Sequence, residues 1–217
     1  MRSIIYILFL LSLSINAYAF NEECINSKEF PFCIYKDSKL DFIILRNEKE
    51  VGWHKVIFEK TSDGFNAITT AYIKARYLLF LDYIFIYSAK SNWVNNQLNS
   101  HEVKIDDDGD EYNISIHKIT EDLLEITDQD NKTITISKNN VLPSEHWHPY
   151  EVKYNTMINT LNGEVIDTKV SKVNDNTWFV DGEVKYYINY DDKGKWTGLK
   201  FNADEDTVIE YLCTNCD

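Results

Sequence analysis

Residues 51–65 of the chain, VGWHKVIFEKTSDGF, decide its fold class. The first ten residues interleave two sets of apolar side chains, one of which contains Trp53 and Ile57, as in a β-strand whose successive residues point to opposite faces. Asp63-Gly64 then predicts a tight hairpin turn, because glycine readily adopts a positive φ. A second strand, antiparallel to the first, is therefore expected from Phe65.

The same strand and turn rhythm continues on both sides of this hairpin. From Leu40 onward turn signals recur about every 8 to 12 residues, and no stretch shows the 3.6-residue period of a helix. In the second half, short aromatic strands are expected at 184–190, 195–201 and 207–213. The predicted fold is all-β and mostly antiparallel, in one of three forms: a curled meander sheet, a partly open barrel or a two-sheet sandwich.

The densest apolar run lies between Ala71 and Tyr87. Its aromatic and branched residues predict strands that are buried on both faces, with a bulge or tight turn at Asp82. A membrane-spanning helix is excluded by the length of the run and by the central Asp82.

The N-terminus has the three parts of a secretory signal peptide. Arg2 provides the positive charge, residues 4–13 are mostly apolar, and Ala17-Tyr18-Ala19 supplies small residues for cleavage. We predict cleavage after Ala19. An uncleaved anchor is disfavoured because Asn16 leaves the apolar run well short of a span.

The predicted organisation follows from that cleavage. Residues 1–19 form the signal peptide, residues 20–39 form an N-terminal segment with Cys24 and Cys33, and residues 40–217 form one antiparallel β domain. Cys24 follows Asn-Glu-Glu rather than a small-residue box, so a lipid anchor is not expected. The mature protein is expected in the periplasm or outside the cell, with no stable membrane insertion and with an oligomeric state that the sequence leaves open.

The mature chain is strongly acidic. The full chain has 22 basic and 35 acidic residues, a net charge of −13, and loss of Arg2 makes it 21 − 35 = −14. A surface of this charge repels nucleic acid and anionic lipid head groups. Nucleic acid is therefore excluded as a partner.

Four cysteines remain after cleavage, and in an oxidising compartment they are expected to form structural disulfides. Local pairing, Cys24 with Cys33 and Cys213 with Cys216, is the preferred arrangement. A clasp that joins the two ends of the chain is the alternative, since four cysteines allow three connectivities. The C-x-x-C spacing at 213–216 also occurs in redox proteins, but here the chain ends one residue later, so a structural role is favoured.

No common catalytic motif is present. The chain lacks G-x-S-x-G, G-x-x-x-x-G-K-[ST] and H-E-x-x-H, and its acid pairs lie at turns or near a terminus. We therefore assign no catalytic residue and no cofactor, and the sequence leans against an enzyme without excluding one.

Two stretches of the sequence partly resemble metal sites. The acidic run 106–110 departs from a calcium loop because Gly109 precedes the third acidic ligand position, so an acidic hairpin turn is expected instead. His146 and His148 are two residues apart, but zinc needs a third ligand, and spacing nominates none of His54, His101 and His117. No metal site is predicted. Residues 144–149 are expected to form an ordered connection whose Trp147 packs on the sheet.

Five short motifs, in order from about Leu40 to Cys213, resemble a family of exported bacterial proteins, mainly from proteobacteria, that is classed only as a domain of unknown function. The motifs are VGWHKVIF at 51–58, WVNNQL at 93–98, DDDG at 106–109, SEHWHP at 144–149 and YDDKG at 190–194. The matching positions are Gly52, His54, Trp93, Leu98, Gly109, Ser144, Trp147, Pro149, Tyr190, Asp191 and Gly194.

The chain departs from that pattern twice, with Asn96 at a family glycine and His148 at a family asparagine. The resemblance implies an envelope or secreted β-protein and carries no activity.

These observations favour an exported β-sheet protein that binds an apolar small molecule or an envelope component without catalysis. The aromatic content of 14% supports this hypothesis, because curled antiparallel sheets can enclose ligands. A structural or partner-binding module, with a filled core and an exposed apolar patch, is the first alternative. A hydrolase of unfamiliar type, with titratable groups converging in a cleft, is the second.

Overall fold

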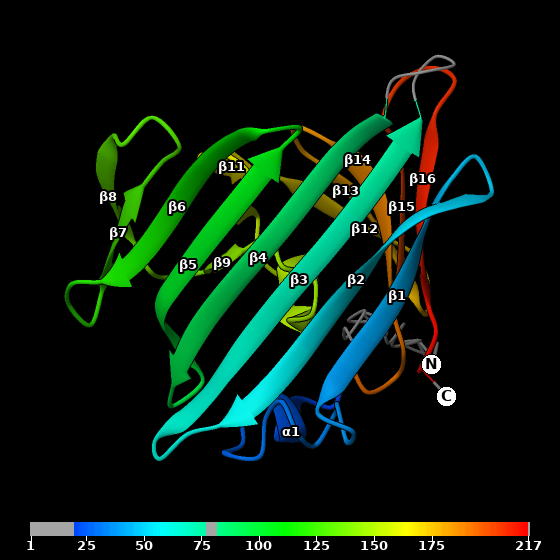
Figure 1. Ribbon diagram of the computed structural model, residues 1–217. Helices are drawn as coiled ribbons and strands as arrows, with labels where there is room; N and C mark the ends of the chain where they lie inside the picture. Colours follow the sequence, from blue (N-terminus) through cyan, green and yellow to red (C-terminus); the bar gives the residue numbers. More distant parts are fainter. Residues whose placement is uncertain (1–19, 77–81, 217) are drawn as a thin grey trace, which may run out of the picture.

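The computed structural model describes residues 20–76 and 82–216. Within these ranges the chain forms one 13-stranded antiparallel sheet and one 3-stranded sheet, so the all-β, mostly antiparallel prediction is confirmed. The large sheet curls around the small one (Figure 1).

The large sheet is built from two meanders that are separated in the chain by an inner segment. The first meander comprises β1 (Lys39–Arg46), β2 (Lys49–Lys60), β3 (Gly64–Arg76), β4 (Asp82–Val94), β5 (Gln97–Asp107), β6 (Asp110–Lys118), β7 (Leu123–Thr127) and β8 (Thr133–Ser137). The inner segment, residues 138–168, holds β9 (Val141–Pro143), the 3₁₀-helix η1 (Pro149–Val152), β10 (Thr156–Ile158) and β11 (Val165–Asp167). The second meander comprises β12 (Lys169–Asn174), β13 (Thr177–Asp181), β14 (Lys185–Tyr190), β15 (Trp196–Asn202) and β16 (Val208–Cys213).

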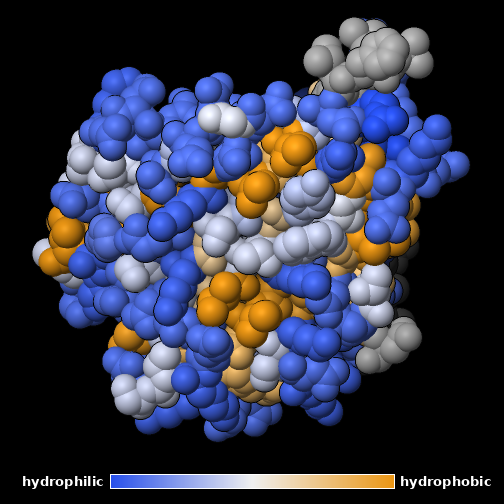
Figure 2. Space-filling view, in the orientation of Figure 1, coloured by the Kyte–Doolittle hydropathy of each residue, from blue (hydrophilic) through white to orange (hydrophobic). Residues whose placement is uncertain are grey.

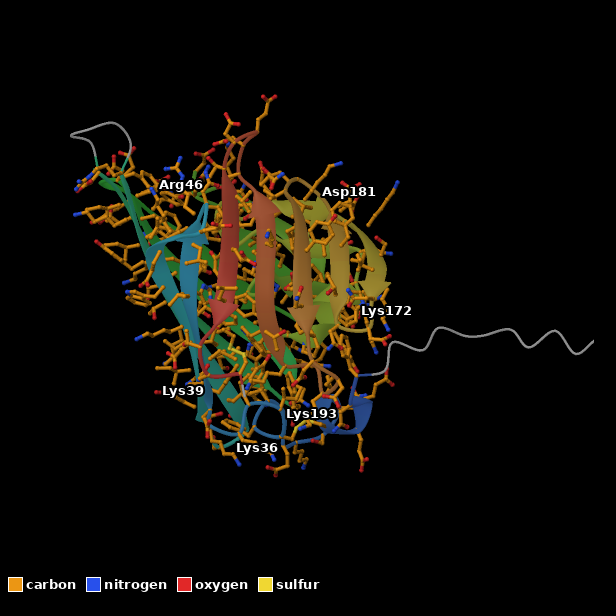
Figure 3. The ribbon with its side chains drawn as sticks, turned by 90° about the vertical axis from the view of Figure 1, so that its right-hand side faces the viewer. Lys36, Lys39, Arg46, Lys172, Asp181 and Lys193 are labelled. Carbon is orange, nitrogen blue, oxygen red and sulfur yellow. A yellow bond between two sulfur atoms is a disulfide. The ribbon has the colours of Figure 1, made fainter. Side chains whose placement is uncertain are left out.

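The two meanders join in the middle of the sheet, where the first strand β1 pairs with the last strand β16. The free edges are β8 and β12, which do not pair with each other, so the sheet is curled but not closed. Figure 3 shows the second meander from the side with strands of the first behind it. The inner segment runs between the two edges on the concave side, which settles the predicted alternatives in favour of a partly open, barrel-like curl.

Strand alternation separates a concave apolar face from an outer face. In β2, the side chains of His54, Val56 and Phe58 are buried while the residues between them face outward. The prediction that the run to Tyr87 is buried on both faces is wrong in its described part, since Ile86 is 42% exposed. An antiparallel sheet needs only one face packed, and here the outer face of β4 meets solvent. Asp82 begins β4 opposite Arg76, and residues 77–81 lie outside the described ranges.

Tight two-residue turns set the register of the first meander. Both turn residues have positive φ at Asn47-Glu48, Asn95-Asn96 and Asp108-Gly109, which matches the twist of antiparallel hairpins. The acidic turn predicted at 106–109 is thus a hairpin between β5 and β6. Asn96 tolerates the conformation of the family glycine, and its amide donates to the carbonyls of Ile25 and Ser27.

The N-terminal segment packs across the lower end of the sheet in Figure 1, where α1 (Glu22–Ile25) lies. Disulfides join Cys24 to Cys33 and Cys213 to Cys216, so the preferred local pairing is confirmed and the terminal clasp is excluded.

Phe20, the first residue after the predicted cleavage point, is buried against Trp178 and Tyr190. The signal peptide predicted at 1–19 lies outside the described residues. In the described part, no helix has the length and apolarity needed to cross a membrane.

Candidate functional site

Trp147 anchors the inner segment to the concave face. Its indole is 1% exposed and lies 5.2 Å from the ring of Phe58 and 5.3 Å from that of Trp93, measured between centroids. The rings of Phe30, Phe65 and His148 complete the aromatic surroundings at 6.1, 5.9 and 5.4 Å. The expectation of an ordered connection with Trp147 packed on the sheet is confirmed.

The backbone around Trp147 is held by tyrosines from distant elements. The Tyr35 hydroxyl donates to the carbonyl of Trp147, and the Tyr190 hydroxyl donates to the carbonyl of His146 over 2.7 Å. Gly194 has a φ of +89°, and a side chain there would lie 3.1 Å from Pro149. The turn at 191–194 is therefore shaped to pack on the start of η1.

His148 takes the place of the family asparagine without loss of its capping role. Its Nδ1 accepts a hydrogen bond of 3.2 Å from the backbone N–H of Tyr150, as an N-cap asparagine would. The ring lies against Phe30 and Trp93, and burial lowers the pKa of His148 to about 3. The departure is therefore compatible with the same local structure.

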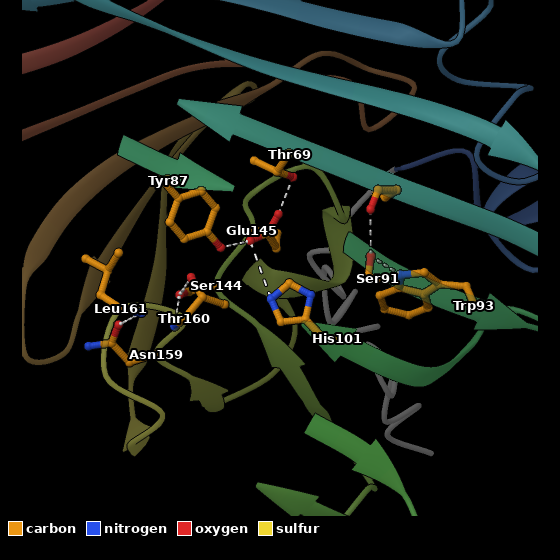
Figure 4. Close-up of polar contacts among 11 residues, drawn as sticks. Thr69, Tyr87, Ser91, Trp93, His101, Ser144, Glu145, Asn159, Thr160 and Leu161 are labelled. Carbon is orange, nitrogen blue, oxygen red and sulfur yellow. Dashed lines mark hydrogen bonds and ion pairs between the residues drawn. The ribbon is translucent and has the colours of Figure 1, made fainter. Parts of the chain in front are cut away.

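Glu145 is a buried carboxylate held by three strands (Figure 4). Its oxygens accept hydrogen bonds from the hydroxyls of Thr69 on β3 and Tyr87 on β4. His101 on β5 places Nε2 3.7 Å from the carboxylate. Burial lowers the pKa of His101 although the Glu145 charge opposes this, and burial together with Glu145 raises that of Tyr87 well above its ordinary value.

Glu151 is a second buried carboxylate of the inner segment, and it contacts the second meander. Its Oε1 lies 2.8 Å from Nδ1 of His146 and accepts a hydrogen bond of 2.7 Å from the Tyr186 hydroxyl on β14. Burial alone would lower the pKa of His146, but the charge of Glu151 and their hydrogen bond raise it above its ordinary value. The two glutamates thus tie the inner segment to both meanders.

A cavity of about 360 Å³ lies between the inner segment and the concave sheet, toward the end of β3 and β4 where Ile73 pairs with Phe85. The volume falls within the usual range of small-molecule sites, about 300 to 1,000 Å³. Across the strands, Ala71 lies in register between His54 and Tyr87, and its small side chain leaves space at the cavity floor. Most of the accessible surface of the lining is apolar, and eight further lining residues have apolar side chains: Ile73, Phe85, Met157, Leu161, Ile166, Val184, Leu199 and Phe201.

The structure brings many of the motif positions to this region. His54 and Ser144 line the cavity, and Trp147 and Pro149 belong to the inner segment. The other motif positions either pack against the inner segment and the core or lie in turns. Trp93, Tyr190 and Gly194 contact the inner segment, Leu98 is buried in the same core, Gly52 packs closely on β3, and Asp191 and Gly109 stabilise turns.

The two histidines of the SEHWHP motif do not share a site. His146 has a φ of +65°, so the segment is not extended there and its ring turns toward Tyr186, whereas His148 faces Phe30 and Trp93. His117 lies elsewhere, half-exposed on β6 beside Glu102. Among the described residues, no group of three or more potential ligands could hold a metal ion.

Sequence reasoning missed the buried partners of the inner segment, Glu145 and Glu151 above all. Their contacts come from strands some 35 to 76 residues away in the chain, which no local pattern connects. One available signal was β3, whose inward residues include the small Ala67, Ala71 and Ala75. Small side chains on one strand face indicate that another segment, or a ligand, approaches it closely.

Residues 42–214 match the family model described as Domain of unknown function (DUF6134). The chain belongs to this family. The DUF6134 match covers most of the chain and confirms the predicted resemblance to a domain of unknown function. No curated protein matches the chain.

Among solved structures, the DUF6134 chain is similar to a β-barrel-like protein of domain of unknown function DUF1849 from Brucella abortus. The TM-score is 0.55 at 9% sequence identity, over 81% of this chain and 94% of that chain. At this identity the likeness concerns the fold alone.

Proposed function

We propose that this protein binds an apolar ligand, without catalysis, in the cavity between the concave sheet and the inner segment. The observation that carries the proposal is the cavity itself, about 360 Å³ and lined mainly by apolar side chains of both meanders and of β10 and β11. Apolar surface removed from water by a ligand contributes roughly 25 cal/mol per Å². The proposed location is the periplasm or the extracellular space, as the predicted signal peptide implies.

Fluorescence titration with N-phenyl-1-naphthylamine tests this proposal. The mature, oxidised protein should bind the probe saturably, with one equivalent per chain. Ile73→Trp extends a partly buried lining residue into the cavity and should weaken binding by about tenfold or more.

Ile57→Trp is the matched control, because it makes the same change on the outer face of β2. It should bind the probe as the unmodified protein does. Absence of saturable binding, or equal affinity in the Ile73→Trp protein, would overturn the proposal.

Hydrolysis is a second candidate, because titratable groups do converge here: Glu145, His146 and His54 all line the cavity. The hydrogen bonds favour binding over hydrolysis, since both oxygens of Glu145 already accept from hydroxyls of the sheet. We expect no turnover of p-nitrophenyl acyl esters above the buffer rate. Turnover that is lost in Glu145→Gln would favour the hydrolase instead.

Apolar side chains on the outer face of the large sheet favour a partner-binding role as a further candidate. Trp53, Tyr72 and Ile86 lie side by side in register across β2, β3 and β4, and Trp53 and Ile86 are exposed. Figure 2 shows apolar groups on this face among hydrophilic surroundings. Exposed apolar patches mark interaction sites when they are large and contiguous. If this patch binds a partner, Trp53→Ser should abolish the association while leaving probe binding intact.

A further inference from the structure

The charges that line the cavity are those of acids and one already paired histidine. Glu145 and Glu183 contribute carboxyl groups, whereas no lysine or arginine of the described residues lines it. Nδ1 of His146 lies 2.8 Å from the Glu151 carboxyl group, so this ring nitrogen is not free to bind a ligand. An anionic ligand would therefore lose its hydration here without meeting a free cation.

His54 lines the cavity and carries a ring nitrogen without a hydrogen-bond partner among the described residues. Its side chain is 8% exposed on β2, and the nitrogen without a partner is Nε2. The ring packs against the aromatic rings of Phe42, Trp196 and Tyr211. Burial, together with the nearby His146, lowers the pKa of His54 to about 3, so at neutral pH it can form a hydrogen bond but brings no positive charge.

Thr168 offers a second such atom. It is 5% exposed, it lines the cavity between β11 and β12, and its Oγ1 makes no hydrogen bond to any described residue. Its backbone N–H donates 2.8 Å to the carbonyl of Asn155, which fixes its position. A buried polar atom without a partner is costly, and a ligand hydroxyl or carbonyl would remove that cost.

We propose that the cavity selects amphiphiles whose head group is uncharged and forms hydrogen bonds, such as an acyl ester of glycerol, over fatty-acid anions of the same chain length. The head group would bond to both His54 Nε2 and Thr168 Oγ1, and the acyl chain would contact the apolar lining. This inference rests on the proposed function, because it names the class of ligand for the same cavity.

Competition against N-phenyl-1-naphthylamine at pH 7.5 tests it. Two competitors share a twelve-carbon chain and differ in the head: 1-monolauroylglycerol and laurate. The neutral ester should displace the probe at a concentration about tenfold or more below laurate, because the anion must be desolvated without meeting a free cation.

Two variants test whether the preference for the neutral ester depends on His54 Nε2 and Thr168 Oγ1. His54→Phe keeps an aromatic ring, and Thr168→Val keeps the shape, while each removes one hydrogen-bonding atom. Both residues line the cavity, so the affinity of each variant for 1-monolauroylglycerol is compared with its own affinity for the probe. Relative to the probe, 1-monolauroylglycerol should bind about two- to twelve-fold more weakly, the range of one net hydrogen bond. His117→Phe and Thr70→Val, which make the same changes on the exposed part of β6 and the outer face of β3, should change neither.

The outcomes separate the two proposals. If the probe does not bind at all, the proposed function fails and this inference fails with it. If the probe binds but laurate competes as well as the ester, the cavity is apolar but does not select a neutral head over an anion, and the inference is overturned. Ester affinity that is unchanged relative to the probe in either variant overturns it too. Should His54→Phe fail to fold, the smaller change Thr168→Val decides.

Discussion

Replacing Trp147 with alanine should lower the free energy of unfolding by about 3 to 5 kcal/mol, the usual cost of deleting a fully buried aromatic ring. The indole is 1% exposed and meets five aromatic rings, three of them at 5.2, 5.3 and 5.4 Å, so no neighbour can readily fill the space. The total free energy of unfolding of a domain is about 5 to 15 kcal/mol. For a chain of this length the loss corresponds to a fall in Tm of roughly 6 to 20 °C.

Urea unfolding of the oxidised mature protein, followed by far-UV circular dichroism, measures this loss. Trp53→Ala is the matched control, since it deletes the same side chain on the outer face, where the ring is 38% exposed and contacts Tyr72. The control should cost about 1 kcal/mol or less. Trp147→Phe should cost less than Trp147→Ala because it keeps a ring and removes an indole N–H that has no partner among the described residues. Equal costs at Trp147 and Trp53 would refute the view that the inner segment is anchored by its tryptophan.

Three further predictions concern pH, the C-terminal disulfide and export. His54 and His148 have folded pKa values of about 3, below the ordinary 6.5, so the stability they contribute is fully present above pH 6.5 and is lost as the pH falls toward 3. In urea unfolding, the free energy of unfolding should fall by up to about 1.4 kcal/mol per pH unit for each histidine as the pH is lowered. If this dependence on pH is as steep in His148→Asn as in the unmodified protein, the prediction is contradicted. Cys213→Ser should cost about 2 kcal/mol by loop-closure entropy and should not alter probe binding; loss of binding in a folded variant would show that this bridge shapes the cavity. Intact mass of the exported protein should correspond to a chain beginning at Phe20, and a retained leader would exclude the predicted cleavage.

Local pattern was sufficient for the class of fold and for its turns. Alternation in residues 51–60 and the Asp63-Gly64 signal predict the hairpin of β2 and β3, because side-chain direction and chain reversal depend on a few neighbouring residues. The turn itself differs from the prediction, because residues 61–63 connect the strands and Gly64 begins β3 without a positive φ. The SEHWHP motif similarly marked Trp147 as an anchor, since a large indole among polar residues needs an apolar surface to cover it.

Tertiary structure decided everything that depends on how distant strands meet. The sequence left the curl, the sandwich and the barrel as alternatives, because each satisfies the same alternation, and only the pairing of β1 with β16 and the unpaired edges distinguish them.

The cavity also depends on contacts between residues that are distant in the chain. His54, Ala71 and Tyr87 share one row only through the registers of β2, β3 and β4. Glu145 becomes a buried carboxylate only because those strands bring hydroxyls to it, whereas the sequence alone shows an ordinary acid in a polar connection. Burial and pKa are properties of the assembled surroundings, which is why the candidate site could be found only once the sheet had curled around its inner segment.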